Sequence, residues 1–445
     1  MSGIAELLVN LGYDVSGSDA KRTELIDRLV SLGVRVAIGH DAANIGQADV
    51  VVTSSAVKAD NVEVLAARTA HVPVIPRAEM LAELMRLRFG IAIAGAHGKT
   101  TTTSMVALAL ERAGLDPTAV IGGRLSAFGS NARLGRGNLM VVEADESDRS
   151  FLKLSPSIAV ITNIDREHME SYGTFERLLD AFVDFADKVP FYGAVVACID
   201  DPHVRAILPR LSRRAITYGF ADDADVRGAL PTTDGRGGRC ETSAGTLTVG
   251  VPGLHNLQNA LAAVAVGQEL GVPFERIAAA LAEFRGADRR YQIKGIVSGV
   301  TVVDDYGHHP TEIAAVLRAA RSGAPRRIIA AFQPHRFSRT RDLLAEFGDV
   351  LADADITLLT DIYPAGESPI PGITSAAIAD AVRMHGRGTV ELVASLDALA
   401  ARAAEIAKTG DVVLTLGAGS IGTVGDAIVR ALQLKATTDS QAVNR

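Results

Sequence analysis

Cysteine, tryptophan and aromatic residues are scarce in this sequence. It has two cysteines, Cys198 and Cys240, which are too few for a disulfide framework and are not spaced as zinc ligands. It has no tryptophan, and aromatic residues make up 4% of its 445 positions. The composition therefore argues against a secreted disulfide scaffold and against a surface built to stack nucleic-acid bases.

An excess of positive charge is also absent. Lys and Arg total 45 and Asp and Glu total 52, which gives a net charge of −7. Because contacts to nucleic-acid phosphates need a basic surface, we expect no DNA or RNA partner. A small anionic ligand held at a local site is compatible with this balance.

Long hydrophobic runs are missing as well. No apolar stretch reaches the roughly 20 residues that a membrane span needs. The N-terminal segment MSGIAELLVNLGYDV lacks the positive region, apolar core and cleavage site of a signal peptide. Together with the low cysteine content, these features predict a cytoplasmic protein that does not insert into membranes. They leave its oligomeric state undetermined.

What the chain does contain is a repeated order of strand, turn and helix, with 42 glycines and 48% hydrophobic residues. This order is typical of an α/β fold with parallel sheets covered by helices on both faces. At about 150 residues per domain, the length suggests three domains, which we place at 1–88, 89–290 and 291–445. We expect a Rossmann-like N-terminal domain, a central P-loop ATPase-type parallel sheet and a Rossmann-like C-terminal domain.

Local signals place single elements. Strands of the first domain are expected at 13–17, 34–39 and 49–53. The segment VPVIPR (72–77) carries two prolines and is interpreted as the approach to the second domain. The glycine-rich run 234–239 is interpreted as the tip of a hairpin.

The segment IAIAGAHGKT (91–100) carries the strongest single signal for function, because it reads as an apolar strand, a glycine-containing loop and the start of a helix. Small residues let backbone N–H groups approach phosphate oxygens at the positive N-terminal end of a helix. Lys99 supplies a positive charge for the terminal phosphates, and Thr100 supplies a hydroxyl for Mg²⁺. Gly95 and Gly98 enclose a loop shorter than the general form. The alternative is a tight strand-to-helix turn with an exposed lysine.

Acidic and polar residues follow two further apolar strands. Glu143 ends one strand and begins the run EADESD, and His168 lies in NIDREHM after another strand. Because ligands collect at the carboxyl ends of parallel strands, both residues are candidate Mg²⁺ ligands beside a transferred phosphate. The alternatives are a solvated acidic loop for the first run and an ordinary surface or core histidine for the second.

Six segments taken together resemble the Mur ligase family: GAHGKTTTT, EADESD, TNIDREHM, GLHNLQNALAA, DDYGHHPTE and FQPHRFSRT. They span nearly the whole chain in the family's order, and the short phosphate loop is the family's own form. Ala96 stands where the family usually has threonine, a departure that we expect to be tolerated. The last two segments favour the branch of the family that adds alanine.

The resemblance implies an ATP-dependent ligase of peptidoglycan precursor synthesis, with UDP-N-acetylmuramate and L-alanine as partners and ATP and Mg²⁺ as cofactors. The muramyl carboxylate would attack the γ-phosphate of ATP, and the acyl phosphate would then react with the amino group of alanine. Because a carboxylate and a triphosphate repel each other, Mg²⁺, Lys99 and loop N–H groups must neutralise their charges. The first domain would bind the UDP substrate, the second ATP, and the third the amino acid and part of the nucleotide.

Matching motifs carry the family's site residues onto this sequence. The residues that would bind the ATP phosphates are Gly95, Ala96, His97, Gly98, Lys99, Thr100 and Thr101. Thr100, Glu143 and His168 would hold Mg²⁺ directly or through water, and Lys99, Glu143 and His168 would form the catalytic set. Asn256 and Asn259, which a helix places on one face, would reach the adenine side.

Residues of the third domain would complete the site. Asp305 and His308 would contact the nucleotide, while Tyr306 would border the alanine. His335, Arg336 and Arg339 would face the muramyl part or the reacting groups. The neighbouring His309 cannot be ranked against His308.

For three arginines, a purely structural explanation stands beside the functional one. We expect one helical turn to align Arg336 and Arg339, so that two guanidinium groups bind phosphate or carboxylate. The alternative for this pair is a solvated basic start of a helix. Arg290, in FRGADRRY, either reaches the ATP phosphates from the hinge or forms an ordinary linker salt bridge.

The N-terminus departs from the pattern of the resembling family, which opens with a strand and a G-x-G-G-x-G-M loop. This sequence starts at that methionine, so we expect the first strand to be missing. Either the true start lies upstream, or the protein is a shortened form with weak UDP binding. The turn at 16–19, with Ser18 and Asp19, would still touch the uridine end, unless it is a plain Ser/Asp turn.

Other functions stay open at this point. Another Mur-type amide ligase would add a peptide or a different amino acid, and a non-catalytic nucleotide-binding protein would bind ATP without substrate-dependent hydrolysis. A dehydrogenase is not expected, because a complete G-x-G-x-x-G unit with its ribose-binding acid is missing. Several relatives carry a carbamylated lysine past the metal-binding histidine, but segment 181–185 has no lysine, so we predict no carbamate.

Overall fold

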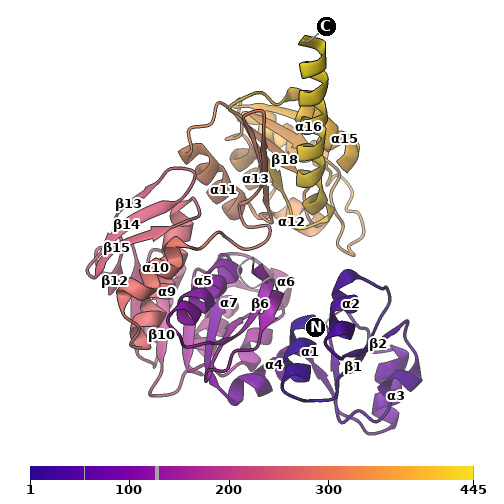
Figure 1. Cartoon of the computed structure of the whole chain (residues 1–445), viewed down its shortest axis with the longest axis vertical. Helices are drawn as coiled ribbons and strands as arrows, with labels where there is room; N and C mark the ends of the chain where they lie inside the picture. The colour runs from indigo at the N-terminus through magenta and orange to yellow at the C-terminus, as the bar shows by residue number, and fades with distance from the viewer. Residues whose placement is uncertain (55, 126–129, 444–445) are drawn as a thin grey trace. The chain divides into compact units, whose positions relative to one another are not determined.

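A computed structural model describes residues 1–54, 56–125 and 130–443 (Figure 1). The chain forms two compact units. The first comprises Met1–Ala229, Glu241–Leu247 and Gln258–Glu283, and the second comprises Leu230–Cys240, Thr248–Leu257 and Phe284–Arg445. Among the described residues, every helix is too short or too polar to cross a membrane.

Short helices and strands alternate in the N-terminal part of the first unit. The helices are α1 (Ser2–Asn10), α2 (Glu24–Ser31), α3 (Val62–Thr69) and α4 (Arg77–Arg86), with a 3-10 turn η1 (Ala42–Ile45). The strands are β1 (Ser16–Asp19), β2 (Arg35–Ile38), β3 (Val51–Thr53) and β4 (Val74–Pro76). Strand β1 pairs in parallel with β2, and β3 pairs in parallel with β4.

This region corrects two sequence-based predictions. The segment expected to be a turn at 16–19 is strand β1, because its residues pair in register with Arg35–Ile38. The segment 72–77, expected to be an approach between domains, contains strand β4. Its prolines are tolerated because proline keeps its carbonyl acceptor: the Val51 N–H donates to the Pro73 carbonyl at 2.9 Å, and Pro76 ends the strand.

An eight-stranded sheet forms the centre of the first unit, in the order β12-β11-β10-β9-β5-β8-β6-β7. Its strands are β5 (Phe89–Ala94), β6 (Thr118–Leu125), β7 (Ser130–Arg133), β8 (Leu139–Glu143), β9 (Ile158–Ile161), β10 (Ala194–Cys198), β11 (Ala215–Gly219) and β12 (Val226–Arg227). Only the edge strand β7 runs antiparallel to its neighbour in this sheet. Strands β9 and β10 are buried at every position, as expected of parallel strands covered on both faces.

Helices follow the strands of this sheet. They are α5 (Lys99–Arg112), α6 (Met169–Tyr172), α7 (Phe175–Ala186), α8 (Pro202–Ile207), α9 (Leu254–Glu269) and α10 (Phe274–Ala282), with 3-10 turns η2 (Ser150–Lys153) and η3 (Leu208–Arg210). Helix α7 buries Phe182 and Phe185 against Phe151 of η2, with ring centroids 5.3 and 5.1 Å apart. These aromatic contacts anchor the segments that lead to and from the carboxyl edge of the sheet.

The pairing register of β5, β8 and β9 places the carboxyl ends of these three strands side by side. Strand β5 lies between β8 and β9, with Ile93 opposite Glu143 and Ala94 opposite Ile161. The loops after these strands therefore start at the same edge of the sheet. They are the predicted phosphate loop, the EADESD run and the NIDREHM segment.

A small three-stranded sheet, β13 (Ala229–Thr233), β14 (Gly238–Thr242) and β15 (Gly245–Val249), lies between the segments of the large sheets along the chain. The predicted hairpin tip at 234–239 is the turn that joins β13 to β14. In that turn the Asp234 carboxylate accepts hydrogen bonds from the N–H groups of Arg236 and Gly237 at 3.0 and 3.1 Å.

The second unit contains a six-stranded sheet in the order β16-β17-β21-β18-β19-β20. Its strands are β16 (Gln292–Val297), β17 (Val300–Asp305), β18 (Ile328–Phe332), β19 (Ile356–Leu359), β20 (Thr389–Leu392) and β21 (Val412–Leu416). Its helices are α11 (Pro310–Ser322), α12 (Phe337–Asp342), α13 (Leu344–Leu351), α14 (Ser375–Met384), α15 (Leu396–Ile406) and α16 (Val424–Val443), with a 3-10 turn η4 (Ser420–Thr423).

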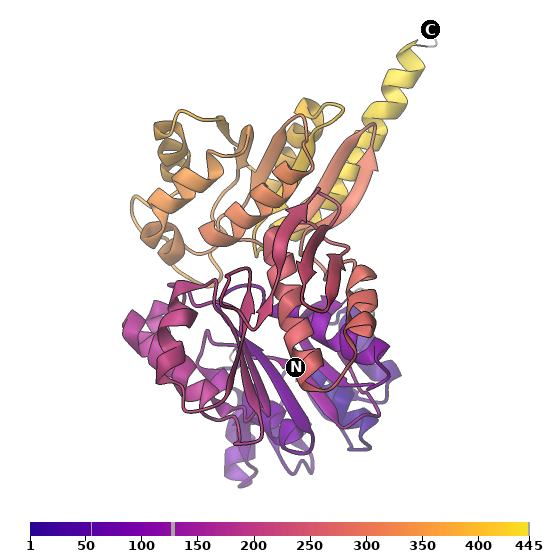
Figure 2. The same ribbon diagram turned by 90° about the vertical axis from the view of Figure 1, so that its left-hand side faces the viewer.

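Strand β16 is antiparallel to β17, and the other neighbours are parallel. Separate apolar cores include Phe332 and Phe347 in one cluster and Ile329 and Ile428 in another. The strands therefore bury apolar side chains on both faces, which is the expected doubly wound pattern. Helix α16 runs on past the sheet that it packs against (Figures 1 and 2).

Candidate active site

The predicted phosphate loop consists of residues 95–98 and joins β5 to α5. Its backbone conformation depends on its two glycines. Gly95 and Gly98 have φ values of +140° and +80°, which side-chain-bearing residues rarely adopt. A Cβ atom on Gly95 would lie 2.0 Å from Thr162 Oγ1, and one on Gly98 would lie 2.7 Å from Asn259 Oδ1. Both glycines are therefore needed for their backbone angle and for the close approach of a neighbour.

Lys99 is held inside this loop rather than exposed. Its ammonium group donates hydrogen bonds to the carbonyls of Gly95 and Ala96 at 2.6 and 2.9 Å and to Glu146 Oε1 at 2.9 Å. The side chains of Lys99 and Glu146 are 16% and 4% exposed. The side chain of Lys99 is therefore not exposed, as the alternative of a plain turn would require, and binding of phosphate by this loop stays a prediction.

The surroundings of this pair raise the pKa values of both groups. Burial by itself would lower the pKa of the Lys99 ammonium, but the Glu146 carboxylate outweighs burial and raises it. Glu143 and Asp145 act on the pKa of Lys99 in the same direction. Burial raises the pKa of Glu146 to about 7 although Lys99 opposes this shift. Lys99 is thus a cation at neutral pH, ready for an anionic ligand.

The carboxylates of the EADESD run accept hydrogen bonds from different parts of the chain. Glu143, predicted as a metal ligand, accepts a hydrogen bond from the Gly122 N–H of β6 at 2.8 Å. Asp145 accepts the Ser147 N–H at 2.9 Å. Burial would raise the pKa of Asp145, but the hydrogen bonds from Ser147 and the charge of Lys99 lower it. The run is therefore partly buried and ordered, which rules out a simple solvated loop.

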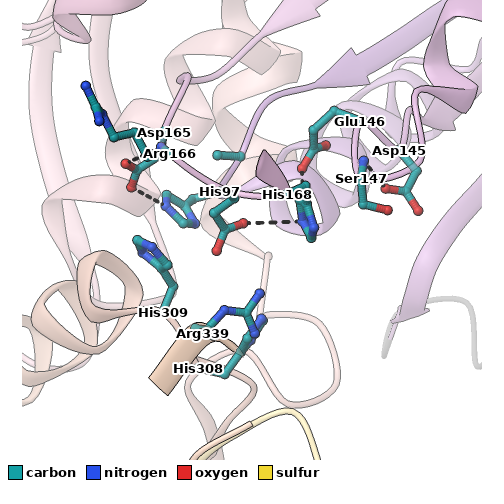
Figure 3. A network of polar contacts seen from close by, with 12 residues as sticks. His97, Asp145, Glu146, Ser147, Asp165, Arg166, His168, His308, His309 and Arg339 are labelled. Atoms are coloured by element: carbon teal, nitrogen blue, oxygen red, sulfur yellow. Dashed lines mark hydrogen bonds and ion pairs between the residues drawn. The ribbon is translucent and has the colours of Figure 1, made fainter. Parts of the chain in front are cut away.

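His168 has a left-handed backbone with φ of +56° and directly precedes α6. Its Nε2 lies 3.6 Å from Glu167 Oε2 and 3.9 Å from Glu146 Oε1 (Figure 3). Among the described residues, Glu146, Glu167 and His168 form a group whose ligand atoms all lie within 4.8 Å of one another. Carboxylate oxygens with one imidazole are a donor set that suits a divalent cation.

The predicted metal set and the observed group overlap only at His168. Sequence reasoning did not single out Glu146 or Glu167, although both lie in the segments that it quoted. Thr100, the third predicted metal ligand, is buried in the first turn of α5. The roles of Thr100, Thr101, Glu143 and His168 toward a metal or nucleotide stay predictions.

The two asparagines of α9 lie on the predicted helix and are both buried. Asn259 faces Gly98 of the phosphate loop, as the close approach of its Oδ1 shows. Asn256 donates from Nδ2 to the Pro252 carbonyl at 2.6 Å. Asn259 therefore packs against the phosphate loop in this structure. Contact with adenine stays a prediction for both asparagines.

In the second unit, Asp305 ends β17 and organises the backbone around it. Its carboxylate accepts the N–H groups of Tyr291 and Gly307, each at 2.7 Å. Burial raises the pKa of Asp305 to about 6, against the charge of Arg290. Asp305 therefore ties the backbone at Tyr291 to the turn that follows Tyr306.

Aromatic and guanidinium groups gather around Tyr306. The guanidinium groups of Arg289 and Arg290 lie 5.1 and 5.2 Å from the centre of its ring, and the His308 ring lies 5.4 Å from it. Arg290 also lies 3.6 Å from Glu312. This ion pair is the linker alternative considered for Arg290, and contact with ATP phosphates stays a prediction.

His308 and His309 have different roles in the structure. The His308 ring lies 3.0 Å from the Tyr306 carbonyl. His309 caps α11, where its Nδ1 accepts the Thr311 N–H at 3.3 Å in a capping box with Glu312. The His308 N–H and ring also contact Glu312, at 3.0 and 3.3 Å, so both histidines help to order the start of α11, and their roles toward a ligand stay predictions.

His335 and Arg339 form part of the same cluster in the second unit. The His335 ring stacks on Tyr363 at 5.5 Å and lies 5.6 Å from the His308 ring. Arg339 Nη1 lies 3.5 Å from His335 Nδ1. Burial, with the neighbouring His308 and Arg339, lowers the pKa of His335 to about 4, so this ring is neutral at neutral pH.

Arg336 does not share a helical turn with Arg339, which corrects the predicted alignment. Its φ of +72° places it before the first residue of α12, and its side chain lies 4.0 Å from Glu367. The turn is fixed instead by Glu367, which accepts the Ser338 N–H and hydroxyl at 3.0 and 2.6 Å. Substrate contact stays a prediction for His335, Arg336, Arg339 and Tyr306.

The residues predicted for the uridine end lie at the carboxyl end of β1. The Ser18 hydroxyl donates to Glu63 Oε2 at 2.6 Å and lies 3.1 Å from His40 Nδ1. Asp19 accepts the Lys21 N–H at 3.1 Å. Burial opposes the ionisation of Glu63, but hydrogen bonds from Ser18, Asn44 and Asp41 lower its pKa. Ser18 is thus part of a polar network with Glu63, and binding of uridine stays a prediction.

Comparison with known proteins decides the family. Residues 1–89 match the Mur ligase family catalytic domain, residues 93–267 the Mur ligase middle domain, and residues 289–419 the Mur ligase glutamate ligase domain. A curated relative from Geobacter sulfurreducens, named UDP-N-acetylmuramate–L-alanine ligase, is 54% identical over 444 residues, with 97% of this chain and 95% of the relative covered. This chain belongs to the Mur ligase family. The predicted resemblance is confirmed.

Further relatives and solved structures agree with Mur ligase membership. A relative of the same name from Anaeromyxobacter dehalogenans is 54% identical over 97% of this chain and 95% of its own length. The crystal structure of the UDP-N-acetylmuramate-alanine ligase MurC from Thermotoga maritima superposes with a TM-score of 0.81 at 29% identity, covering 98% of this chain and 97% of that one. The three-domain α/β fold predicted from the sequence is confirmed.

We expect Gly98→Ala to abolish nucleotide binding and to cost about 1–3 kcal/mol of stability. The new Cβ would meet Asn259 Oδ1 at 2.7 Å and would force a strained φ of +80° on alanine. Titration of the protein with ADP would measure the effect. Gly114→Ala, at φ of +85° with open space around it, carries the same backbone strain away from the loop. Equal ADP affinity in both variants would contradict a role for Gly98 in the site.

Proposed function

We propose that this chain is an ATP-dependent ligase that joins L-alanine to the muramyl carboxylate of UDP-N-acetylmuramate in the synthesis of peptidoglycan precursors. The observation that carries the proposal is the buried cation Lys99 at the start of α5, which bonds to Glu146 after β8, with Glu146 itself 3.9 Å from His168 after β9. The names of the relatives at 54% identity supply the substrate class. The Mur ligase family depends on ATP, which agrees with a phosphate loop at this place.

The first step would transfer the γ-phosphoryl group of ATP to the muramyl carboxylate. A carboxylate oxygen forms a bond to phosphorus, the bond between phosphorus and the β,γ-bridging oxygen breaks, and ADP leaves. Lys99 would turn its ammonium from the loop carbonyls and Glu146 to the phosphate oxygens. The N-terminal end of α5 would stabilise the same charge, because its first N–H groups have no partner within the helix.

A divalent cation, Mg²⁺ in our proposal, would be held by His168 with Glu146 and Glu167, and directly or through water by Thr100 and Glu143. When bound, it neutralises charge that builds up between the two anionic reactants. The residues fit such an ion by their donor chemistry, since hard oxygens outnumber the single nitrogen.

The second step would form the amide. The alanine amine attacks the acyl carbon, a tetrahedral intermediate forms, and inorganic phosphate leaves with the electron pair of the broken C–O bond. The cluster of Tyr306, His308, His335 and Arg339 in the second unit is our candidate for binding the amino acid and the reacting groups. Because burial lowers the pKa of His335 to about 4, this ring is neutral and weakly basic at neutral pH, and the proton that the amine loses would pass to solvent.

The peptide-adding alternative is less well supported. A murein peptide ligase from Psychrobacter arcticus superposes with a TM-score of 0.70 at 25% identity, below the corresponding values for the alanine ligase from Thermotoga maritima. A non-catalytic nucleotide binder would share Lys99 but would not need the group of Glu146, Glu167 and His168 beside it. We therefore favour the alanine ligase.

The amino substrate is the deciding test. A coupled assay would follow ADP release with UDP-N-acetylmuramate, ATP and each amino acid or peptide in turn. We expect L-alanine to give the highest kcat/KM, and ADP release without an amino substrate to stay at background. A higher kcat/KM for a peptide would assign the chain to the peptide-adding branch. ATP binding without turnover for any substrate would support the non-catalytic alternative.

A further inference from the structure

The phosphate loop is fastened by a segment for which neither the proposed function nor the predicted site has a role. This segment is 162–165, at the end of β9, and we call it the clasp. The Asn163 carbonyl accepts the Ala96 N–H at 3.0 Å, and Asn163 Oδ1 accepts the His97 N–H at 2.8 Å. Asn163 Nδ2 donates to the His97 carbonyl at 3.0 Å. One asparagine therefore binds both residues that separate Gly95 from Gly98.

Neighbours of Asn163 reinforce the same contact. The Thr162 hydroxyl donates to the His97 carbonyl at 2.7 Å, so this carbonyl accepts two side-chain hydrogen bonds. The His97 ring nitrogen Nε2 lies 2.9 Å from Asp165 Oδ2, and Figure 3 shows the His97 ring directed at that carboxylate. Gly95 lies so close to Thr162 and Asn163 that only glycine fits there.

We infer that Asn163 is a positioning residue for nucleotide binding, acting through the backbone of Ala96 and His97. The loop has only these two residues between its glycines, so it cannot wrap itself around a phosphate as a longer loop does. Contacts from outside the loop must therefore fix its shape. The clasp makes a hydrogen bond to each peptide group between Gly95 and Gly98. Preorganised N–H groups gain binding energy because they do not reorganise when the anion arrives.

The clasp also connects the loop to the metal-binding corner. Asn163 and His168 lie in one short connection between β9 and α6. The same segment thus fixes the loop that carries Lys99 and leads to the histidine proposed to hold the cation. This inference rests on the proposed function for its substrate, ATP, but its test on ADP binding does not require the ligase reaction.

The test uses Asn163→Ala and Thr162→Val with a matched control, Thr217→Val. Thr217 lies in β11 of the same sheet and bonds through its hydroxyl to Asp225 at 2.8 Å, away from the loop. ADP dissociation constants would be measured by titration calorimetry, and KM values for ATP, L-alanine and UDP-N-acetylmuramate by ADP release. Melting temperatures without ligand would report stability separately.

We expect Asn163→Ala to raise the Kd of ADP and the KM of ATP about tenfold, because two net hydrogen bonds to the loop are lost. Thr162→Val should raise both by a smaller factor, and neither variant should change the KM of L-alanine by more than about twofold. Thr217→Val should lower the melting temperature without changing ADP affinity. If Asn163→Ala does not fold, Thr162→Val decides.

Two results would overturn the inference. One is a folded Asn163→Ala, or Thr162→Val alone if the former is unfolded, that binds ADP as tightly as the wild type. The other is an equal rise in all three KM values, which indicates general damage. If the wild type binds ADP but releases none from ATP with any amino substrate, the proposed function fails while the ADP titrations still test Asn163.

Discussion

Replacing Lys99 by alanine is expected to lower kcat for alanine-dependent ADP release by about 10³-fold, the upper range for removing one preorganised donor to a developing anion. Lys99 is the one residue of the loop whose charge directly faces the terminal phosphates in our proposal. The measurement is ADP release at saturating substrates. If Lys99→Ala kept its activity within a few-fold of the wild type, the phosphate loop would be wrongly assigned.

Loss of stability could imitate this result, because Lys99 compensates a buried carboxylate. Removing one partner of a buried ion pair costs about 3–5 kcal/mol when the other stays charged. Burial already raises the pKa of Glu146 to about 7, so protonation of Glu146 in the variant would reduce that cost. A melting curve beside each activity measurement separates the two effects.

The double variant Lys99→Met with Glu146→Gln sharpens the distinction. It removes both charges and keeps the volume of the two side chains, so we expect stability close to that of the wild type. Activity should remain as low as in Lys99→Ala, because the phosphate still lacks its cation and the proposed metal ligand Glu146 is changed as well. Recovery of activity in the double variant would show that Lys99 serves only to neutralise Glu146.

The strand–loop–helix unit of β5 and α5 could be predicted from the sequence because its signals are local. An apolar strand, two glycines and Lys99-Thr100 follow each other within one strand–loop–helix unit, and each residue type has a physical reason to be there. The same holds for the strands that end at Glu143 and before Asn163. Apolar runs bounded by polar residues predict buried parallel strands whatever the rest of the chain does.

The partners of Lys99 could not be predicted in the same way. The choice between Glu143 and Glu146 depends on the strand order β9-β5-β8 and on the path of the backbone after β8, neither of which a single sequence fixes. The resemblance directed attention to Glu143 as a Mg²⁺ ligand and named no partner for Lys99, whose ammonium binds Glu146 in the structure. Arg336 illustrates another limit of sequence-based prediction, because its spacing from Arg339 does not predict a φ of +72°.

Replacing His168 by alanine is expected to raise the Mg²⁺ concentration for half-maximal activity at least about tenfold, since even outer residues of metal sites contribute 10–100-fold to affinity. Activity would be titrated with Mg²⁺ at constant free ATP, and Mn²⁺ binding to the protein with ADP would be counted by electron paramagnetic resonance. His203→Ala is the control, because that ring packs on Phe175 at 4.7 Å. An unchanged Mg²⁺ requirement in His168→Ala would remove His168 from the site.

The companion variants Glu167→Gln and Glu143→Gln then decide between two descriptions of the metal site. The geometry groups Glu167 with Glu146 and His168, whereas the family motif points to Glu143. If the ion is held by the observed group, Glu167→Gln weakens Mn²⁺ binding as His168→Ala does. If Glu143→Gln alone has that effect, Glu143 binds the ion through an oxygen not committed to the Gly122 N–H, and Glu167 serves to orient His168.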